Sequence, residues 1–519
     1  MQGPAIRIAR ELGLCAVAAD GNPDAPCASM ADRFAHIDLK DKEGIEAFAR
    51  SLQNDGGLAG IMTAGTDFSA TVAWVAERLG LPGIPYEAAL NASDKARMRS
   101  CFDKARLPSP PFTAITRDAA LDDIALSFPL VVKPVDNMGG RGCRRVDTIE
   151  ELREAAADAL RFSRSGRAIV EAFMDGPEFS VDAIVYHGEI TICGLADRHI
   201  FFPPYFIEMG HTMPTDFPPE QQAALLETFC AGVRALGLAG TESVGAAKGD
   251  IKLTAHGPMI GEIAARLSGG YMSGWTYPYA SGVEPIRAAI LAAVGRKPDG
   301  LTPLKNWTSA ERAFISIPGT VKAITGVEAA RNLPHVRDLF LRAAEGGKIG
   351  FPQNNVSKCG NIIAAAPGRV SAVEAAETAA RSILINLDPS DNETAAFLSS
   401  DAAFPPDAFS LTPALKEALA QLPETTLSSP QSSSPSLLPF PAFAASTLTD
   451  YMGRTVAESL RAVRELTGLL LPEIGESTHN TTDNIGSFPE SRFLGRSFWA
   501  ALARGGYQGA VYYINQLRV

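Results

Sequence analysis

Hydrophobic positions in residues 1–90 follow two different periods in turn. Three segments have the period of amphipathic helices, and three short apolar runs between them are typical of buried strands. The helical segments are residues 4–12, 41–52 and 69–79, and the strand-like runs are residues 14–20, 32–39 and 58–63. This alternation predicts a parallel, doubly wound α/β sheet. Because the chain begins with a helix, we expect the first strand of such a domain to be missing.

A strand-like pattern returns at residues 249–266, where it predicts a hairpin. Apolar residues alternate there with small or polar ones, as they do in half-buried strands. The apolar residues are Ile251, Leu253, Met259 and Ile263. Ala255, His256 and Gly257 predict a three-residue turn between the two strands. The pattern therefore places the apolar side chains together on one face of the hairpin.

Two acids lie on the opposite face of this predicted hairpin. If Thr254 faces Pro258, then Asp250 faces Glu262, with Cβ atoms about 4.5–5.5 Å apart. Two carboxylates at that separation repel by roughly 3 kcal/mol at an effective dielectric of about 20. Hard oxygen ligands without Cys or His nearby suit Mg²⁺, which commonly arrives with nucleotide phosphates. The alternative is a solvated hairpin whose acids never share a ligand.

The composition is that of an ordinary globular protein and limits the expected partners. The 519 residues suggest about three domains, and 46% of them are hydrophobic and 20% charged. A formal net charge of −11 argues against nucleic acid and anionic membranes as partners. The seven cysteines form no CxxC pair, which favours a reducing compartment. With no signal-peptide pattern and no apolar run long enough to span a membrane, we expect a cytoplasmic protein.

Composition and pattern also divide the later part of the chain. Residues 301–395 mix strands and helices, whereas residues 396–445 are rich in Ser, Pro and Ala. The second segment contains a low-complexity run at 428–436 and is typical of a linker. Residues 448–470 have the period of a helix, so residues 446–519 are expected to form a last small unit of unknown role.

A glycine-rich segment follows a strand that ends in a lysine. Residues 128–134 have the pattern of a strand carrying Lys133, and Gly139, Gly140 and Gly142 come soon after it. Glycines let backbone N–H groups approach an anion without obstruction by side chains. The chain has no GxxxxGK[ST] sequence and no GxGxxG after a strand, so neither a P-loop nor a dinucleotide motif is present. Taken alone, the segment is as typical of a structural turn as of a phosphate loop.

A crossing from strand to loop lies at residues 168–185. An apolar strand reaches Glu171, and after a turn a second strand begins with Glu178. Backbone groups at such a crossing are suited to bind a purine edge, and the Glu178 carboxylate is suited to accept hydrogen bonds from ribose hydroxyls.

The order of these segments resembles that of the ATP-grasp superfamily over roughly residues 1–390. The motifs that carry the resemblance are Ser-Asp-Lys at 93–95, Val-Val-Lys-Pro at 131–134, the glycine loop at 136–142, Val-Glu-Ala-Phe-Met at 170–174, Gly-Pro-Glu-Phe-Ser-Val-Asp at 176–182 and Gly-Glu-Ile-Ala-Ala-Arg-Leu-Ser-Gly-Gly at 261–270. The resemblance implies a multidomain protein of the α/β and α+β classes. It would have a Rossmann-like domain at 1–92, an ATP-grasp domain at 93–300 with a flap at 110–170, and a small lid-type domain at 301–395.

The resemblance implies that two lysines and the glycine loop bind the ATP phosphates. Lys95 and Lys133 would contact the phosphates directly. Gly139, Gly140 and Gly142 would close over them as a mobile lid.

The resemblance also implies a place for the nucleoside. Glu171 and the backbone of Ala172, Phe173 and Met174 would hold the adenine. Glu178 would bind the ribose.

Metal ions and the transferring phosphoryl group are expected at the hairpin. The resemblance implies that Asp250 and Glu262 hold two Mg²⁺ or Mn²⁺ ions bridging the β- and γ-phosphates. Arg266 would stabilise the negative charge of the phosphoryl group or of an acyl phosphate. The chain departs from the family at Ala264, where many relatives carry an Asn that serves as a further metal ligand. The second ion is therefore expected to be held more loosely or through water.

Substrate residues are expected on two further segments. Arg198 would be an additional phosphate contact, and Glu208 and His211 would meet the amine or carboxylate of a substrate. The segment Ser268, Gly269 and Gly270 would shape the carboxylate pocket. The alternative for the first group is a set of polar residues on an irregular surface loop.

Together these roles imply an ATP-dependent carboxylate–amine ligase that forms an amide through an acyl phosphate and releases ADP. Its partners would be small-molecule carboxylates and amines, and a homodimer is suggested by analogy alone. Three alternatives stay open. They are a carboxylase or carbamoyl-phosphate-type enzyme that uses bicarbonate, a phosphotransferase that stops after phosphorylation, and an ATP-binding regulator without turnover.

Overall fold

The structure of the chain is a computed structural model that describes residues 2–424, 441–469, 471 and 493–518. The chain forms two compact units. The first comprises Met1–Glu311, Gln353–Asn355 and Ile363–Val373, and the second comprises Arg312–Pro352, Val356–Ile362 and Glu374–Val519. Within the described residues, no helix is both long enough and apolar enough to cross a membrane.

The N-terminal part of the first unit contains the helices expected from the hydrophobic pattern. Its elements are α1 (Gln2–Glu11), β1 (Val17–Asp20), β2 (Arg33–His36), α2 (Lys42–Asn54) and α3 (Ser69–Leu79). Gly13 follows α1 with a φ of 77°, and the Asp41 side chain caps α2 by accepting a hydrogen bond from the Gly44 N–H. β1 and β2 pair in parallel. The three predicted helices and the first two predicted strands are confirmed.

The third predicted strand, at residues 58–63, is wrong. These residues form no strand hydrogen bonds and run as an irregular segment. Gly60 lies so close to α9 (Pro285–Ala293) that a Cβ there would be 2.0 Å from the Ala293 carbonyl oxygen. Leu58 and Ile61 pack, partly buried, beside α2 and α3. Their apolar character therefore reflects packing against helices.

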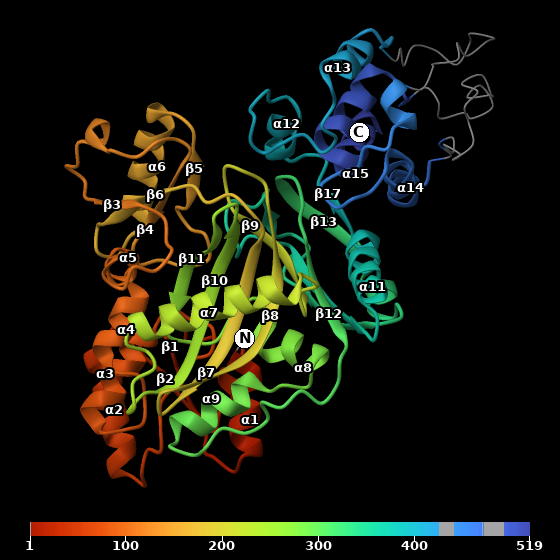
Figure 1. Cartoon of the computed structure of the whole chain (residues 1–519). Coiled ribbons are helices and arrows are strands. Elements are labelled where there is room, and N and C mark those ends of the chain that lie inside the picture. The colour runs from red at the N-terminus through yellow and green to blue at the C-terminus, as the bar shows by residue number, and fades with distance from the viewer. Residues whose placement is uncertain (1, 425–440, 470, 472–492, 519) are drawn as a thin grey trace. The chain divides into compact units, whose positions relative to one another are not determined.

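A four-stranded antiparallel sheet follows, with one helix packed on it. Its strands are β3 (Phe112–Ile115), β4 (Leu130–Pro134), β5 (Arg144–Val146) and β6 (Ala168–Ala172), in the order β3-β6-β4-β5. Helix α6 (Ile149–Phe162) buries Leu152, Ala155 and Ala159 against the sheet (Figure 1). The Thr148 side chain caps this helix by accepting from the Glu151 N–H. The loop between β4 and β5 contains the glycine-rich segment.

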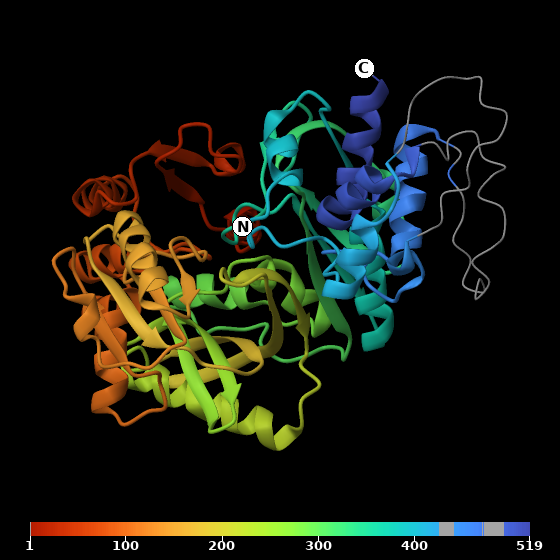
Figure 2. The same ribbon diagram turned by 90° about the horizontal axis from the view of Figure 1, so that it is seen from above.

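A larger antiparallel sheet forms the centre of the first unit. Its strands are β7 (Glu178–Tyr186), β8 (Glu189–Phe201), β9 (Ile207–Met213), β10 (Val244–Thr254) and β11 (Gly257–Ala264), in the order β11-β10-β7-β8-β9. These strands lie side by side in both views (Figure 2). Helices α4 (Tyr86–Ser93), α5 (Lys95–Lys104) and α7 (Pro219–Ala235) cover one face through a shared apolar core. The short elements of this unit are η1 (Ala28–Met30), η2 (Leu121–Asp123), the π-helical turn η3 (Met272–Thr276) and α8 (Tyr277–Ala280).

The opposite face of this sheet changes character along each strand. On β7, Ile184 is buried in a core shared with α1 and α9. The next residues on the same face, at the alternation of a strand, are Asp182, Ser180 and Glu178. β10 follows the same order, from Ala246 in that core to Lys248, Asp250 and Lys252. One end of the face is thus apolar and the other carries acids and lysines.

The β10–β11 hairpin pairs Asp250 with Glu262, as predicted, by a different route. Thr254 pairs with Gly257, so the turn has two residues and the predicted partner Pro258 is wrong. A bulge next to Asp250 restores the pairing, because Gly261 is an extra residue on β11 between Ile260 and Glu262.

The bulge also changes which apolar residues reach the core. Ile260 is fully buried beside Ile251 and Ile263, whereas Met259 is only partly buried. The predicted core position of Met259 is therefore wrong.

The second unit contains a small sheet and a helical C-terminal part. The sheet has the order β15-β13-β17, made of β15 (Lys348–Ile349), β13 (Gly319–Thr325) and β17 (Leu384–Leu387). The other strands of this region are β12 (Thr308–Phe314), β16 (Gly360–Ala366) and β14 (Val336–Leu341), and β12, β16 and helix α11 (Arg369–Ser382) cross the boundary between the units. Further helices are α10 (Val327–Arg331), α12 (Asn392–Leu398), α13 (Pro413–Ala420), η4 (Ala442–Ala445), α14 (Val456–Thr467) and α15 (Arg496–Arg518).

The C-terminal helices differ from the predicted linker and last unit. α13 lies inside the predicted linker, and Phe409 is fully buried in a core with Trp499 of α15. The linker prediction is therefore wrong over residues 396–424, while residues 425–440 lie outside the described residues. α14 begins at Val456 because Thr455 and Glu458 form a capping box there, so the predicted helical start at 448 is also wrong.

Candidate active site

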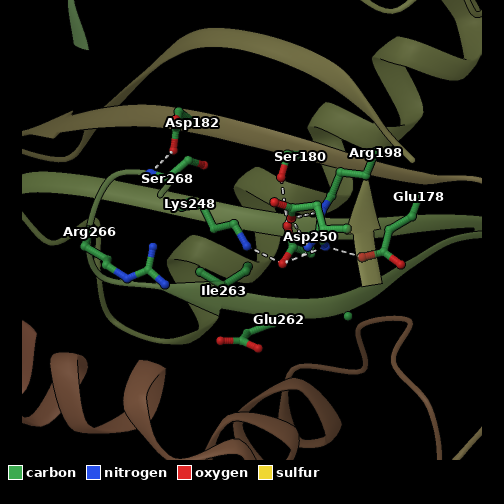
Figure 3. Close-up of polar contacts among 12 residues, drawn as sticks. Glu178, Ser180, Asp182, Arg198, Lys248, Asp250, Glu262, Ile263, Arg266 and Ser268 are labelled. Atoms are coloured by element: carbon green, nitrogen blue, oxygen red, sulfur yellow. Dashed lines mark hydrogen bonds and ion pairs between the residues drawn. The ribbon is translucent and has the colours of Figure 1, made fainter. Parts of the chain in front are cut away.

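The charged end of the large sheet gathers most of the predicted site residues on one face. Strand pairing places Lys252 beside Glu178, Asp250 beside Ser180 and Lys248 beside Asp182. Figure 3 shows the Lys248 and Arg198 side chains turned toward Asp250 from two directions. The charged face is therefore a direct result of strand alternation on β7 and β10.

Asp250 is the best-connected carboxylate of this face. The Ser180 hydroxyl donates to its Oδ1 at 2.8 Å, and Arg198 Nη1 lies 3.0 Å from its Oδ2. Lys248 also forms an ion pair with Oδ2. Burial pushes the pKa of Asp250 upward, but Arg198 and Lys248 outweigh it, so the pKa lies below its ordinary value. The side chain is a permanent carboxylate at neutral pH.

Glu262, on β11, shares Lys248 with Asp250 and faces two further lysines, Lys95 and Lys133. Lys95 Nζ, at the start of α5, lies 3.6 Å from Glu262 Oε2 and donates to the Asn137 carbonyl oxygen at 2.9 Å. Burial raises the pKa of Glu262, but Lys95, Lys248 and Lys133 outweigh burial and lower the pKa to about 2. The predicted pairing of Asp250 with Glu262 is present, and the predicted roles of these acids and of Lys95 stay predictions.

Lys133 is held by a buried ion-pair cluster behind the glycine loop. Its Nζ lies 2.8 Å from Glu171 Oε2, and Arg99 Nε lies 2.8 Å from Glu171 Oε1. Arg99 also donates to the carbonyl oxygen of the bulge residue Gly261 at 2.6 Å. Burial raises the pKa of Glu171, but Arg99 and Lys133 lower it below its ordinary value. The Glu171 carboxylate thus forms ion pairs with both Lys133 and Arg99. The ion pair with Glu171 orients the Lys133 side chain.

The segment predicted to hold adenine runs from the end of β6. The N–H groups of Ala172 and Phe173 donate to the carbonyl oxygens of Pro111 and Pro129, both at 3.0 Å. Lys252 Nζ donates to the Met174 carbonyl oxygen at 3.1 Å.

Cations and a second aromatic ring lie around Phe173. The Arg145 guanidinium lies 4.8 Å from the centre of the Phe173 ring, and Lys252 Nζ lies 5.2 Å from it. The Phe206 ring stacks on Phe173 at a centroid distance of 6.3 Å. Aromatic and cationic groups of this kind suit a purine base.

Arg198 connects the nucleotide side of the face to the predicted substrate residues. It forms ion pairs with Glu178, with Asp250 and with Glu208, whose Oε2 lies 2.6 Å from Nη2. Burial disfavours the guanidinium charge, but the three carboxylates raise the pKa of Arg198 well above its ordinary value. These contacts exclude the alternative of an irregular surface loop, because Arg198 and Glu208 lie on strands β8 and β9.

His211 lies between two carboxylates on the buried side of β9. Its Nδ1 is 2.6 Å from Glu311 Oε2, and its Nε2 is 3.5 Å from Glu208 Oε2. Burial lowers the pKa of His211, but Glu208 and Glu311 raise it to about 9. A Cβ on Gly270 would lie 3.0 Å from Glu208 Oε1 and 3.6 Å from His211 Cε1. The structure therefore brings three of the predicted substrate residues together.

The predicted carboxylate segment begins beside a buried acid. The Ser268 N–H donates to Asp182 Oδ1 at 2.9 Å, and burial raises the pKa of Asp182 to about 6 despite this bond. Arg266 is 8% exposed and donates through Nη1 to the Leu267 carbonyl oxygen at 2.8 Å. A Cβ on Gly269 would lie 3.7 Å from the Gly65 carbonyl oxygen.

Several residues of this site were missed by the sequence reasoning. They are Arg99, Asp182, Lys248, Lys252 and Asn355, whose contacts with predicted site residues are described above and below. Lys248 and Lys252 were detectable, because they flank Asp250 at strand spacing and must share its face. Arg99 and Asn355 act across long sequence separations and gave no local signal.

The oxygen donors at the hairpin fit a hard divalent cation. Asp250 and Glu262 are paired in register, and hard carboxylate oxygens suit Mg²⁺ or Mn²⁺. Across the described part of the chain, no group of three or more His, Cys, Asp or Glu side chains is placed to hold a metal. Ligand oxygens such as phosphates must therefore complete any coordination sphere here.

Two protein families match separate parts of the chain. Residues 126–273 match the ATP-grasp domain, and residues 313–388 match the L-amino acid ligase C-terminal domain 2. The first match lies within residues 93–300 and the second within residues 301–395, and the suspected ATP-grasp resemblance is confirmed. The proposed domain boundaries themselves stay a prediction.

Relatives and a solved structure agree with these matches. The chain is 28% identical over 339 residues to the uncharacterized protein y4rH of Sinorhizobium fredii. This alignment covers 64% of this chain and 69% of that protein. It is 26% identical over 402 residues to carnosine synthase 1 of Gallus gallus, covering 70% of this chain and 42% of that protein. The crystal structure of an L-amino acid ligase from Bacillus licheniformis superimposes with a TM-score of 0.67 at 23% identity, over 74% of this chain and 96% of that one. This likeness confirms the mixed α/β multidomain fold.

Proposed function

We propose that this chain, which has an ATP-grasp domain followed by an L-amino acid ligase C-terminal domain, is an ATP-dependent carboxylate–amine ligase. It would activate a carboxylate as an acyl phosphate, join it to an amine and release ADP and phosphate. The observation that carries this proposal is the paired Asp250 and Glu262 within a ring of lysines and arginines. Such an arrangement is suited to an anionic ligand that brings its own divalent cation.

The chemistry explains why so many charges converge on one sheet face. A carboxylate does not react with an amine at neutral pH, because oxide is a poor leaving group, whereas phosphate is a good one. Phosphoryl transfer depends mainly on positioning and on neutralising negative charge. Lys95 and Lys133 are proposed to bind the phosphates, and Arg266 to stabilise the transferring group. The glycines at 139–142 would cover the acyl phosphate and exclude water.

Divalent cations are part of the proposal at Asp250 and Glu262. When bound there, Mg²⁺ or Mn²⁺ would supply further neutralisation of the β- and γ-phosphates. Two ions are proposed, with phosphate oxygens supplying the ligands that Ala264 lacks. Lys248 and Arg198 keep Asp250 ionised and oriented.

The two substrates are proposed to be small molecules bound on either side of Arg198. The segment Ser268–Gly270, beside Arg266, is suited to the carboxylate substrate. Glu208 is suited to an ammonium group, which a carboxylate attracts. The name of the matched L-amino acid ligase domain favours amino acids as substrates. A cytoplasmic homodimer completes the proposal, and sedimentation of the purified protein tests the dimer.

A phosphate-release assay tests the proposed function. The protein is incubated with Mg²⁺-ATP and pools of amino acids, first singly and then in pairs. Release that requires two substrates, with ADP and an amide as products, is the expected result. Release with bicarbonate alone would indicate a carboxylase-type enzyme, AMP as product would contradict acyl-phosphate chemistry, and no release with any pool would indicate a regulator.

A further inference from the structure

Asn355 contacts two parts of the proposed site at once. Its backbone N–H donates to the Gly139 carbonyl oxygen at 2.8 Å. Its side-chain Oδ1 accepts from the Glu208 N–H, also at 2.8 Å. Although it is distant in sequence, the short segment Gln353–Asn355 clusters with the first unit. One residue thus bridges the glycine loop and strand β9.

The glycine loop has a shape that depends on such contacts. Gly139 and Gly140 have φ values of 72° and 76°, a conformation that residues with a side chain rarely adopt. A Cβ on Gly140 would lie 3.7 Å from Asn355 Nδ2 and 3.8 Å from the Phe206 carbonyl oxygen. The loop is therefore packed against Asn355 and against the start of β9.

A direct hydrogen bond also joins the flap to the segment that precedes β9. The Arg145 N–H, at the start of the returning strand β5, donates to the Pro204 carbonyl oxygen at 2.9 Å. Residues 204–206 therefore lie beside the flap at Arg145 and at Gly140. Asn355 differs from the Arg145 contact because it also holds the backbone of Glu208 itself.

Glu208 connects this bridge to the acid pair. Its Oε2 lies 2.6 Å from Arg198 Nη2, and Arg198 Nη1 lies 3.0 Å from Asp250 Oδ2. A continuous path of hydrogen bonds and ion pairs therefore runs from Gly139 through Asn355, Glu208 and Arg198 to Asp250. A displacement of β9 would therefore displace the glycine loop as well, because Asn355 is hydrogen-bonded to both.

We propose that Asn355 is a positioning residue that couples closure of the glycine loop to the placement of Glu208. This inference rests on the proposed ligase function. When Glu208 is in place, Asn355 holds the loop over the phosphates, so the acyl phosphate is shielded from water until the amine attacks. Without the side-chain bond, the loop closes less often and water competes for the acyl phosphate.

Four variants separate the side-chain bond from general effects at this position. N355L has a side chain of similar size without an acceptor, and N355D keeps an acceptor oxygen in the same place. N355A gives the same comparison should N355L fail to fold. Q353A changes an exposed neighbour and is the matched control. All four retain the backbone N–H of residue 355, and only N355L and N355A remove the acceptor for the Glu208 N–H.

The first measurement is hydrogen exchange of residues 136–143 with and without Mg²⁺ and a non-hydrolysable ATP analogue. The analogue should slow exchange about tenfold or more in the wild type, in N355D and in Q353A. In N355L this protection should largely disappear. Wild-type protection in N355L would overturn the proposal, and it would do so even if the protein were not a ligase.

The second measurement is the ratio of phosphate released to amide formed with a substrate pair that the wild type joins. The ratio should be close to one in the wild type, in N355D and in Q353A, and should rise several-fold in N355L. An unchanged ratio in N355L would overturn the coupling to Glu208. If the wild type forms no amide with any pair, the proposed ligase function fails, while the exchange measurement still decides whether Asn355 holds the loop.

Discussion

One face of the large sheet has opposite characters at its two ends. At one end, Ile184 and Ala246 are buried in a core under α1 and α9. At the other end, on the same strands and the same face, lie Ser180, Asp182 and Asp250, held by ion pairs and hydrogen bonds. The apolar end is expected to hold the strands in place, and the charged end is expected to perform chemistry. The two ends should therefore respond in opposite ways to mutation.

The largest effect is expected at the charged end. Replacing Glu262 with Gln removes one of the two paired carboxylates and should reduce turnover by about 1,000-fold or more. The fold should persist, because Gln keeps the size and shape of the Glu262 side chain, although the attraction to Lys95 is lost. Steady-state phosphate release and thermal unfolding measure the two effects, with the exposed Glu189→Gln as the control. Turnover that survives in E262Q would contradict the metal assignment.

The apolar end should behave in the reverse way. Ile184→Ala leaves a cavity in the core under α9 and should lower the free energy of unfolding by about 2–5 kcal/mol. The turnover of the folded fraction should stay close to that of the wild type, since Ile184 belongs to the apolar core shared with α1 and α9. Urea denaturation and active-site titration measure these quantities. Val370→Ala, at a 68% exposed position, should change neither.

Lys248 sharpens the comparison because it lies between the two ends. Lys248→Met removes the ion pair with Asp250 and should reduce turnover by about 100-fold, as the loss of one preorganised charge does. Mg²⁺ affinity in the presence of an ATP analogue should rise or stay constant, because Asp250 loses a competing cation. Isothermal titration gives this affinity, and Lys297→Met at an exposed position is the control. A loss of turnover equal to that of the control would show that Lys248 has no role.

The smallest effect concerns pH and the buried His211. Its pKa is about 9 in the folded chain against an ordinary value of 6.5. The charged imidazole therefore stabilises the fold fully below pH 6.5, and this contribution, on the order of 1–3 kcal/mol, is lost as pH rises toward 9. Urea midpoints measured between pH 6 and pH 9.5 should fall more for the wild type than for His211→Gln. Parallel curves for the two proteins would contradict a charged His211 between Glu208 and Glu311.

Helices and strands were predicted from the sequence more accurately than contacts between residues that are far apart in the chain. Helices 41–52 and 69–79 follow from their hydrophobic period, and strand alternation placed Asp250 and Glu262 on one hairpin. The acid pairing was reached through a wrong turn, because the two-residue loop and the extra residue Gly261 offset each other. The apolar run at 58–63 was indistinguishable from a strand, since packing on helices produces the same pattern.

Residues that act over long sequence separations gave no signal. Arg99 reaches the Gly261 carbonyl oxygen across 162 residues, and Glu208 reaches Asn355 across 147. Such contacts depend on how the strands and loops are folded together, which no local period encodes. The predicted roles of Lys95, Lys133, Arg198 and Arg266 stay predictions, although the structure places these residues around the charged face.

The bulge at Gly261 has a practical consequence for the hairpin tip. Ala255 and His256 at the tip are exposed. The bulge shifts the pairing register of the two strands at a point between the tip and the two acids. Arg99 of α5 donates a hydrogen bond to the carbonyl oxygen of the bulge residue Gly261, which holds the adjacent Glu262 in position. A fluorophore or an affinity peptide attached at the tip would thus report on this strand pair, or immobilise the protein, without shifting either carboxylate.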